Sequence, residues 1–209
     1  MKLVKTLLAA AALTATLVAN ASVIGSTGGG LGTFAALSGT GVTPNSGGTL
    51  GGSITGVLVG GMVFSADQSF ADDVVPGESF LGAGPTAGSP ATLTVAGTGL
   101  DYVSFLWGSP DLYNLLTVNS TGPGPNSQNF TVTSLAFPVT NGDQSFNQSV
   151  QFFATSGGKI TSLVFTSSQN AFEAGRFSTT APIPEPETYA LMLAGLGVMG
   201  FMARRRKNG

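Results

Sequence analysis

Short apolar runs separated by turn-forming residues are the feature that most restricts how this chain can fold. In several runs the apolar residues alternate, so that Val103, Phe105 and Trp107 fall on one face of an extended segment. Glycine, proline and asparagine interrupt the pattern, for example at 122–125 and 141–142, and the body of the chain shows no helical period. The runs predict roughly eight strands, at 54–64, 91–96, 102–107, 113–118, 130–137, 149–154, 160–166 and 171–178.

These strands fit an all-β fold, an antiparallel β-sandwich or jelly roll. The chain has 209 residues, about the size of one all-β domain once terminal signals are removed. Charged residues make up only 9% of it, but 14 phenylalanines can supply an aromatic core, so the composition argues against disorder. We expect a Gly/Ser/Thr-rich N-terminal segment at 22–50 and the sandwich domain at 51–180.

The N-terminus has the three parts of a secretory signal peptide. Lys2 and Lys5 supply the positive charge, and an apolar stretch follows at 6–18. Ala19 and Ala21 then form the small-residue pattern at which signal peptides are cleaved. The apolar stretch is also short for a membrane span. The sequence therefore predicts export, with the signal peptide ending at Ala21.

The C-terminal tail reads as an extended strip followed by a membrane helix. Proline fixes φ and disfavours helix at the residue before it, so Pro184, Glu185 and Pro186 should stay extended and accessible. The apolar run 188–203 reaches about 24 Å as a helix, against roughly 30 Å of hydrocarbon, so it is a short membrane-spanning segment. Four consecutive cations end it: Arg204, Arg205, Arg206 and Lys207. Because such a cluster stays cytoplasmic, the body is expected on the periplasmic side.

Residues 183–207 resemble the PEP-CTERM sorting domain nearly residue for residue. The resemblance implies recognition by an exosortase, a membrane-embedded transpeptidase-like enzyme of Gram-negative bacteria that make exopolysaccharide. It also implies export through the inner membrane, attachment to that membrane by the C-terminal helix before processing, and a place at the cell surface or outside the cell afterwards. The sorting residues would be features of a substrate and not catalytic groups.

Two segments of the body, 102–118 and 165–173, resemble a recurrent set of exosortase-dependent surface proteins. Members of that set commonly have an Asp-Asn pair after the Ala-Phe-Glu that ends here at Glu173. This chain instead has Gly175 and Arg176 nearby.

The charges and missing residue types exclude several classes of function. Between residues 22 and 183, two basic residues, Lys159 and Arg176, stand against eight acidic ones, a net charge of −6. Phosphate backbones should repel such a body, so nucleic acid is not an expected partner. The chain has no cysteine and no histidine, which removes thiol chemistry, imidazole ligands and the commonest general base. No pair of acids stands out for glycoside hydrolysis. We therefore expect a protein that is not an enzyme and holds no cofactor.

Four acidic residues crowd a loop-like stretch after Phe64: Asp67, Asp72, Asp73 and Glu78. Carboxylates on a flexible backbone are ligands that Ca²⁺ prefers. Their spacing matches no EF-hand loop, and the alternative is an acidic surface that keeps a weakly charged domain soluble.

One stretch carries a candidate contact for carbohydrate. Trp107, Asp111, Tyr113 and Asn114 lie close in sequence, and sugar recognition uses an exposed ring together with oriented hydrogen bonds. The alternative places Trp107 in the core, because it shares a strand face with Val103. The main hypothesis is thus a structural protein of an exopolysaccharide or biofilm matrix, and the alternative is a lectin-like module that binds exopolysaccharide.

Overall fold

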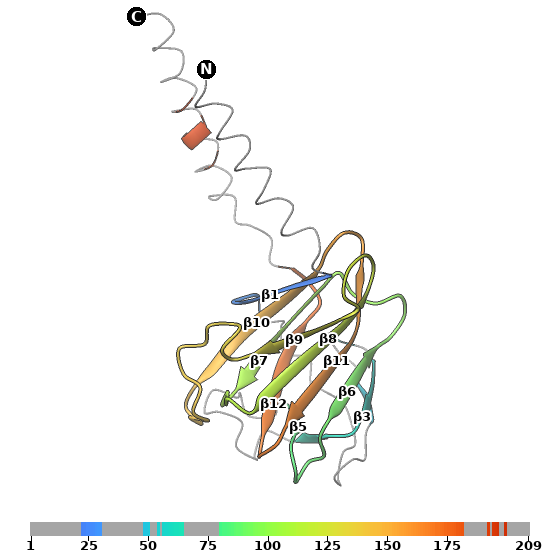
Figure 1. Ribbon diagram of the computed structural model, residues 1–209, viewed down its shortest axis with the longest axis vertical. Coiled ribbons are helices and arrows are strands. Elements are labelled where there is room, and N and C mark those ends of the chain that lie inside the picture. Colours follow the sequence, from blue (N-terminus) through green and yellow to red (C-terminus); the bar gives the residue numbers. More distant parts are fainter. Residues whose placement is uncertain are drawn as a thin grey trace, which may run out of the picture.

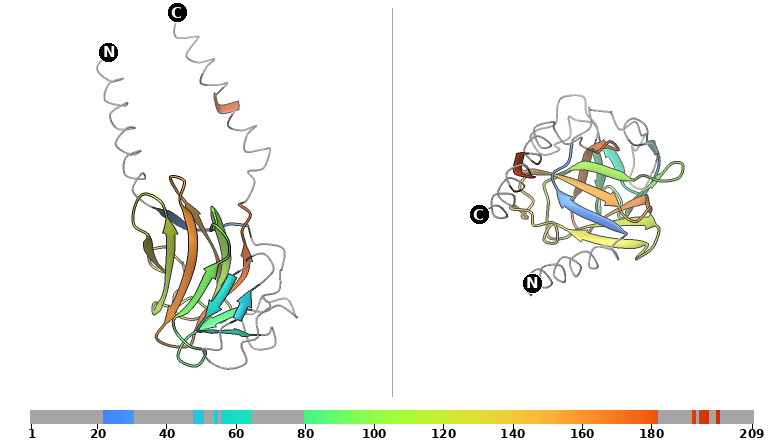
Figure 2. Two further views of the ribbon diagram at one scale, coloured as in Figure 1. Left: turned by 90° about the vertical axis from the view of Figure 1, so that its right-hand side faces the viewer. Right: turned by 90° about the horizontal axis from the view of Figure 1, so that it is seen from above.

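The computed structural model describes the body of the chain and a few residues of its tail. The described residues are 22–30, 48–50, 54, 56–64, 80–181, 192, 194–196 and 199. Within these ranges the chain forms twelve strands in two six-stranded antiparallel sheets, which lie face to face (Figures 1 and 2). This confirms the predicted antiparallel β architecture.

Each sheet mixes strands from distant parts of the chain. The order in the first sheet is β1 (Val23–Thr27), β10 (Asn147–Ala154), β7 (Tyr102–Gly108), β12 (Phe172–Ser178), β5 (Phe80–Ala83) and β4 (Met62–Phe64). The order in the second sheet is β2 (Gly48–Leu50), β3 (Gly56–Val59), β6 (Ala91–Val95), β11 (Lys159–Ser167), β8 (Asn114–Thr121) and β9 (Ser127–Thr131).

Strands β5 to β12 pair in a nested way. β5 pairs with β12, β6 with β11, β7 with β10, and β8 with β9, all antiparallel. The chain thus runs out along β5 to β8 and returns along β9 to β12. The reversal is the turn predicted at 122–125, where Gly122 and Gly124 have positive φ, a conformation that glycine adopts without a steric penalty.

Phenylalanine rings hold the two sheets together. The ring of Phe165 on β11 meets Phe105 on β7 edge-on, with centroids 5.7 Å apart, and also packs against Phe172 on β12. Trp107 is fully buried with them and belongs to the same core cluster. Because burial of one such side chain contributes roughly 1.5–3 kcal/mol, this aromatic layer is a large part of what stabilises the sandwich.

Two apolar runs differ from their predicted form. The run 54–64 is broken by Gly60 and Gly61, both with positive φ, and a Cβ on Gly60 would lie 2.3 Å from the carbonyl oxygen of Pro90. The strand predicted at 130–137 is wrong after Thr131, where β9 ends. There the Thr131 and Ser134 side chains hydrogen-bond each other's backbone N–H, at 3.1 and 2.8 Å, and hold a turn.

The predicted domain boundary at residue 51 runs through the sheets. β1 and β2 lie in the segment predicted as a separate N-terminal stretch, yet β1 pairs with β10 and β2 with β3. Every residue of β1 has a partner on β10, from Val23 opposite Ala154 to Thr27 opposite Val150. These strands therefore form part of the sandwich.

Several predicted features lie outside the described residues. They are the signal peptide 1–21 with Ala19 and Ala21, the acidic residues Asp67, Asp72, Asp73 and Glu78, the sorting residues Pro184, Glu185 and Pro186, and the cations Arg204, Arg205, Arg206 and Lys207. The predicted membrane segment 188–203 is described only at five helical positions. Over the described part of the chain, none of the helical segments has the length and apolar character needed to cross a bilayer.

Candidate functional site

A pocket of about 310 Å³ opens on the outer face of the first sheet. It lies where the β5–β6 loop and the β11–β12 loop meet the strands. Strand alternation explains why Glu173 faces it: Ala174, the next residue of β12, belongs to the core cluster, so Glu173 points to the opposite face. The residues lining it are Phe64, Phe80, Gly82, Thr86, Ala87, Asn170, Ala171 and Glu173.

Two stacked rings form the apolar wall of the pocket. Phe64 of β4 and Phe80 of β5 lie with centroids 5.2 Å apart and planes at 16°, and Leu106 packs with them. Gly82 makes this arrangement possible, because a Cβ at that position would lie 2.4 Å from Cε2 of Phe64. The Phe64 ring therefore lies directly over the backbone of β5.

Glu173 is the charged residue of the pocket. It is only 7% exposed, and its Oε2 accepts a hydrogen bond of 2.7 Å from the hydroxyl of Ser109, which follows β7. Burial raises the pKa of the Glu173 carboxyl, because leaving water disfavours the charged form, and the hydrogen bond from Ser109 acts in the opposite direction. The carboxyl group is thus held in place but lacks much of the solvation that an ionised acid needs.

Asn170 locks the two loops at the rim of the pocket to each other. Its Oδ1 accepts from the backbone N–H of Thr86 at 3.1 Å, and its Nδ2 donates to Oγ1 of Thr86 at 2.6 Å. Gly84 leaves room for this contact, since a Cβ there would lie 2.9 Å from Oδ1 of Asn170. The amide of Asn170 is therefore engaged within the protein.

Tyr113 connects a third loop to the same rim. Its hydroxyl donates to the carboxylate of Asp111 and also lies 3.3 Å from the carbonyl oxygen of Asn170. The pKa of Tyr113 is raised to about 12 by its burial, by the hydrogen bond to Asp111, and by the negative charges of Asp111 and Glu173. Two acidic side chains, Asp111 and Glu173, thus lie near Tyr113 at this end of the sandwich.

The structure separates the four residues predicted to contact carbohydrate. Trp107 is fully buried and stacks on Phe172 with centroids 4.1 Å apart, so its ring offers no face to a sugar. Asn114 is also buried; its Oδ1 accepts from the N–H of Asp111 and its Nδ2 donates to Ser167. Asp111 and Tyr113 are partly exposed and lie beside the pocket.

The pocket itself was not anticipated from the sequence. The sequence pattern pointed to Glu173 only through a resemblance, and it gave no sign that Phe64, Phe80 or Asn170 belong to a site. A signal does exist in β12, where an acidic residue falls in a run of otherwise uncharged, buried positions from Phe172 to Gly175. A buried acid in a strand indicates either a polar partner or a site.

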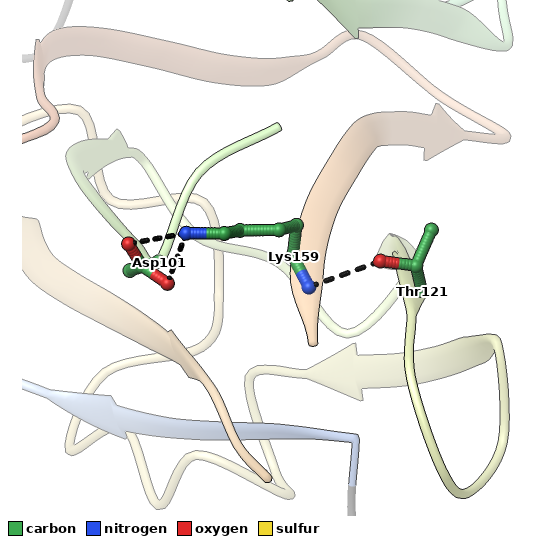
Figure 3. A network of polar contacts seen from close by, with 3 residues as sticks. All are labelled: Asp101, Thr121 and Lys159. Carbon is green, nitrogen blue, oxygen red and sulfur yellow. Dashed lines mark hydrogen bonds and ion pairs between the residues drawn. The ribbon is translucent and has the colours of Figure 1, made fainter. Parts of the chain in front are cut away.

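The lysine of the body is engaged at the other end of β7. Its Nζ forms an ion pair with Asp101, at 2.6 Å, and its backbone N–H donates to the hydroxyl of Thr121 (Figure 3). The side chains of Lys159 and Asp101 are 36% and 75% exposed, so the pair contributes little to stability. Lys159 therefore does not neutralise the acids around the pocket.

Comparison with known proteins identifies the tail of the chain and not its body. No curated protein and no solved structure matches the chain significantly. The family model of the PEP-CTERM protein-sorting motif matches residues 182–207. The match begins four residues after the end of β12 at Ser178, so it includes none of the twelve strands and no residue that lines the pocket. Residues 182–207 are a PEP-CTERM protein-sorting motif, which marks the chain as an exosortase-dependent protein that is exported and sorted to the cell surface.

Proposed function

We propose that the chain is a structural protein of the extracellular matrix, whose β-sandwich is delivered to an exopolysaccharide or biofilm layer. One observation carries the proposal: the sorting motif begins at residue 182, directly after a sandwich whose last strand ends at Ser178. A folded domain joined to a sorting signal by so short a connection is cargo for the sorting enzyme.

The route to the surface forms part of this proposal. A signal peptide ending at Ala21 directs export, and the helix 188–203 with its terminal cations holds the chain in the inner membrane until an exosortase acts near Pro184 to Pro186. The composition supports a role without catalysis, because the sequence has neither histidine nor cysteine.

We also infer that β5 to β12 form a jelly roll. The nested pairing supports this, since eight strands that pair first with last, through to the β8–β9 hairpin, roll into two four-stranded layers. The remaining strands extend the sheet edges: β1 lies beside β10, β4 beside β5, β3 beside β6, and β2 beside β3.

The intact mass of the mature protein tests the sorting part. In cells with a working exosortase we expect both termini to be shortened, at Ala21 and near Pro186. A triple Pro184→Ala, Glu185→Ala, Pro186→Ala variant should keep residues 204–209, whereas Glu187→Ala, in the same strip, should be processed normally. Wild-type surface material that still carries residues 204–209 would contradict the assignment.

The matrix role is tested in a strain that lacks the gene. We expect the loss of the protein to weaken retention of exopolysaccharide at the cell surface, and the wild-type gene to restore it. A strain complemented with the triple sorting variant should behave like the deletion. Unchanged retention in the deletion strain would remove the matrix role and leave the sorting assignment intact.

The lectin-like alternative keeps one supporting observation, the position of Asp111 and Tyr113 beside a pocket. Trp107→Ala cannot test it, because truncating a core ring destabilises the domain. Asp111→Asn on a glycan array is the better variant. Loss of a specific glycan signal in Asp111→Asn, with the fold retained, would favour the lectin, and absence of any signal from the wild type would exclude it.

A further inference from the structure

The pocket contains a buried carboxyl group, and no described residue forms an ion pair with it. Among the residues that line it, Glu173 is the one ionisable side chain. Among the described residues it accepts one hydrogen bond, from Ser109 to Oε2. Its other oxygen, Oε1, is not one of the fully buried atoms that have no partner, so it keeps some contact with solvent. Oε1 is thus the oxygen that can meet a molecule in the pocket.

The surrounding charges favour a cation at this point. Asp111 lies at the same rim, and its charge together with that of Glu173 contributes to the raised pKa of Tyr113. Lys159 pairs with Asp101 at the far end of β7, so it does not neutralise these acids. A positive ligand would replace the water that the carboxylate lost on burial.

The other polar groups of the pocket argue against a neutral polyol. A sugar needs several oriented hydrogen bonds, but the Asn170 amide already bonds to Thr86 through both its oxygen and its nitrogen. Glu173 is the least engaged of the polar side chains that line the pocket, since it accepts one hydrogen bond, at Oε2, from the described residues. Such a lining suits a ligand whose hydrogen-bond donors all belong to one positively charged group.

The composition of the pocket also argues against a metal ion. No group of three metal-binding side chains occurs within the part of the chain that the structure describes. A single carboxylate beside two phenylalanine rings is a poor site for Ca²⁺, which takes six to eight oxygen ligands. The rings instead offer an apolar surface for carbon.

We propose that this pocket binds a small organic ammonium ion, with the ammonium group on Glu173 and the carbon part against Phe64 and Phe80. The volume of about 310 Å³ is at the lower end of the range for ligand sites, so the ligand is small. The proposal is independent of the matrix role, because the arguments for that role do not use this pocket.

Calorimetric titration of the full-length chain in a neutral detergent tests the proposal. The probes are benzylammonium and its uncharged counterpart benzyl alcohol, at neutral pH. We expect the ammonium probe to bind at least about tenfold more tightly, because hydrogen bonds to a charged group are the stronger class. Equal affinities, or no binding of either probe, would overturn the proposal.

Two variants locate the binding. Glu173→Gln keeps an acceptor for Ser109 and removes the charge, so it should fold and lose the preference for benzylammonium. Phe64→Leu should weaken both probes, since both use the apolar wall. Asp143→Asn removes the same charge from an exposed loop residue and should leave both affinities unchanged. Retention of the preference in Glu173→Gln, or unchanged binding in Phe64→Leu, would overturn the proposal.

Titration with a neutral oligosaccharide distinguishes the ammonium site from the lectin alternative. If a neutral oligosaccharide binds more tightly than benzylammonium and needs Glu173, the ammonium site is refuted in favour of sugar binding. If such oligosaccharides do not bind while benzylammonium does, the ammonium site is supported. The mass of the surface protein is unaffected in either case, so failure here is separable from failure of the proposed function.

Discussion

Replacing Phe165 with alanine should remove three ring contacts that join the two sheets. Phe165 is fully buried on β11, and its ring meets Phe105, Phe172 and Phe177, all from the opposite sheet, at 5.7, 5.1 and 6.3 Å between centroids.

The expected loss follows from burial and ring contacts. Phe→Ala substitutions in well-packed cores cost about 3–5 kcal/mol in the free energy of unfolding. A double-mutant cycle with Phe105→Leu and Phe165→Leu should show a coupling of roughly 0.5–1.5 kcal/mol, the usual size for an edge-on aromatic pair. For a domain of this size, the alanine variant should melt roughly 6–20 °C lower.

Urea unfolding followed by circular dichroism measures both quantities, since a shift of the midpoint at constant m reports stability alone. Phe153→Leu is the matched control, because Phe153 is 36% exposed on the outer face of the first sheet and should cost less than about 1 kcal/mol. A loss below about 1 kcal/mol for Phe165→Ala, or a coupling of zero, would refute the view that this ring layer joins the sheets.

Three further changes probe the pocket. Burial raises the pKa of Glu173 in the folded state above its unfolded-state value of 4.5. The free energy of unfolding of the wild type should therefore fall as pH rises from 4.5 through the raised folded value. Glu173→Gln should abolish this pH dependence, as measured by urea unfolding at several pH values. Burial and the neighbouring acids raise the pKa of Tyr113 from 10 to about 12 in the folded state, so the free energy of unfolding should fall between pH 10 and 12. Tyr113→Phe should remove this loss, as measured by urea unfolding across that pH range. Gly82→Ala should displace the Phe64 ring and lower the free energy of unfolding by about 1–3 kcal/mol, and an unchanged urea midpoint would contradict the packing described.

Local patterns in the sequence were sufficient for much of the fold. The alternation of Val103, Phe105 and Trp107 correctly assigns them to one face, because side chains of a strand point alternately to its two sides. The glycines of segment 122–125 correctly mark a reversal of the chain. The prediction failed after Thr131, because hydrogen bonds between two side chains and the backbone, which apolar periodicity does not report, ended the strand.

The sorting signal could be identified from the sequence alone, because it is a contiguous motif whose charge and apolar length are local properties. The pocket depended on the tertiary structure. Thr86 and Asn170 are 84 residues apart, and they meet only because β5 pairs with β12 and brings the two loops to one end of the sandwich. Likewise, only the packing of the two sheets decided that Trp107 is buried while Glu173 faces a pocket. Short-range periodicity reports which residues share a face, but which faces become covered is set by pairing between distant strands.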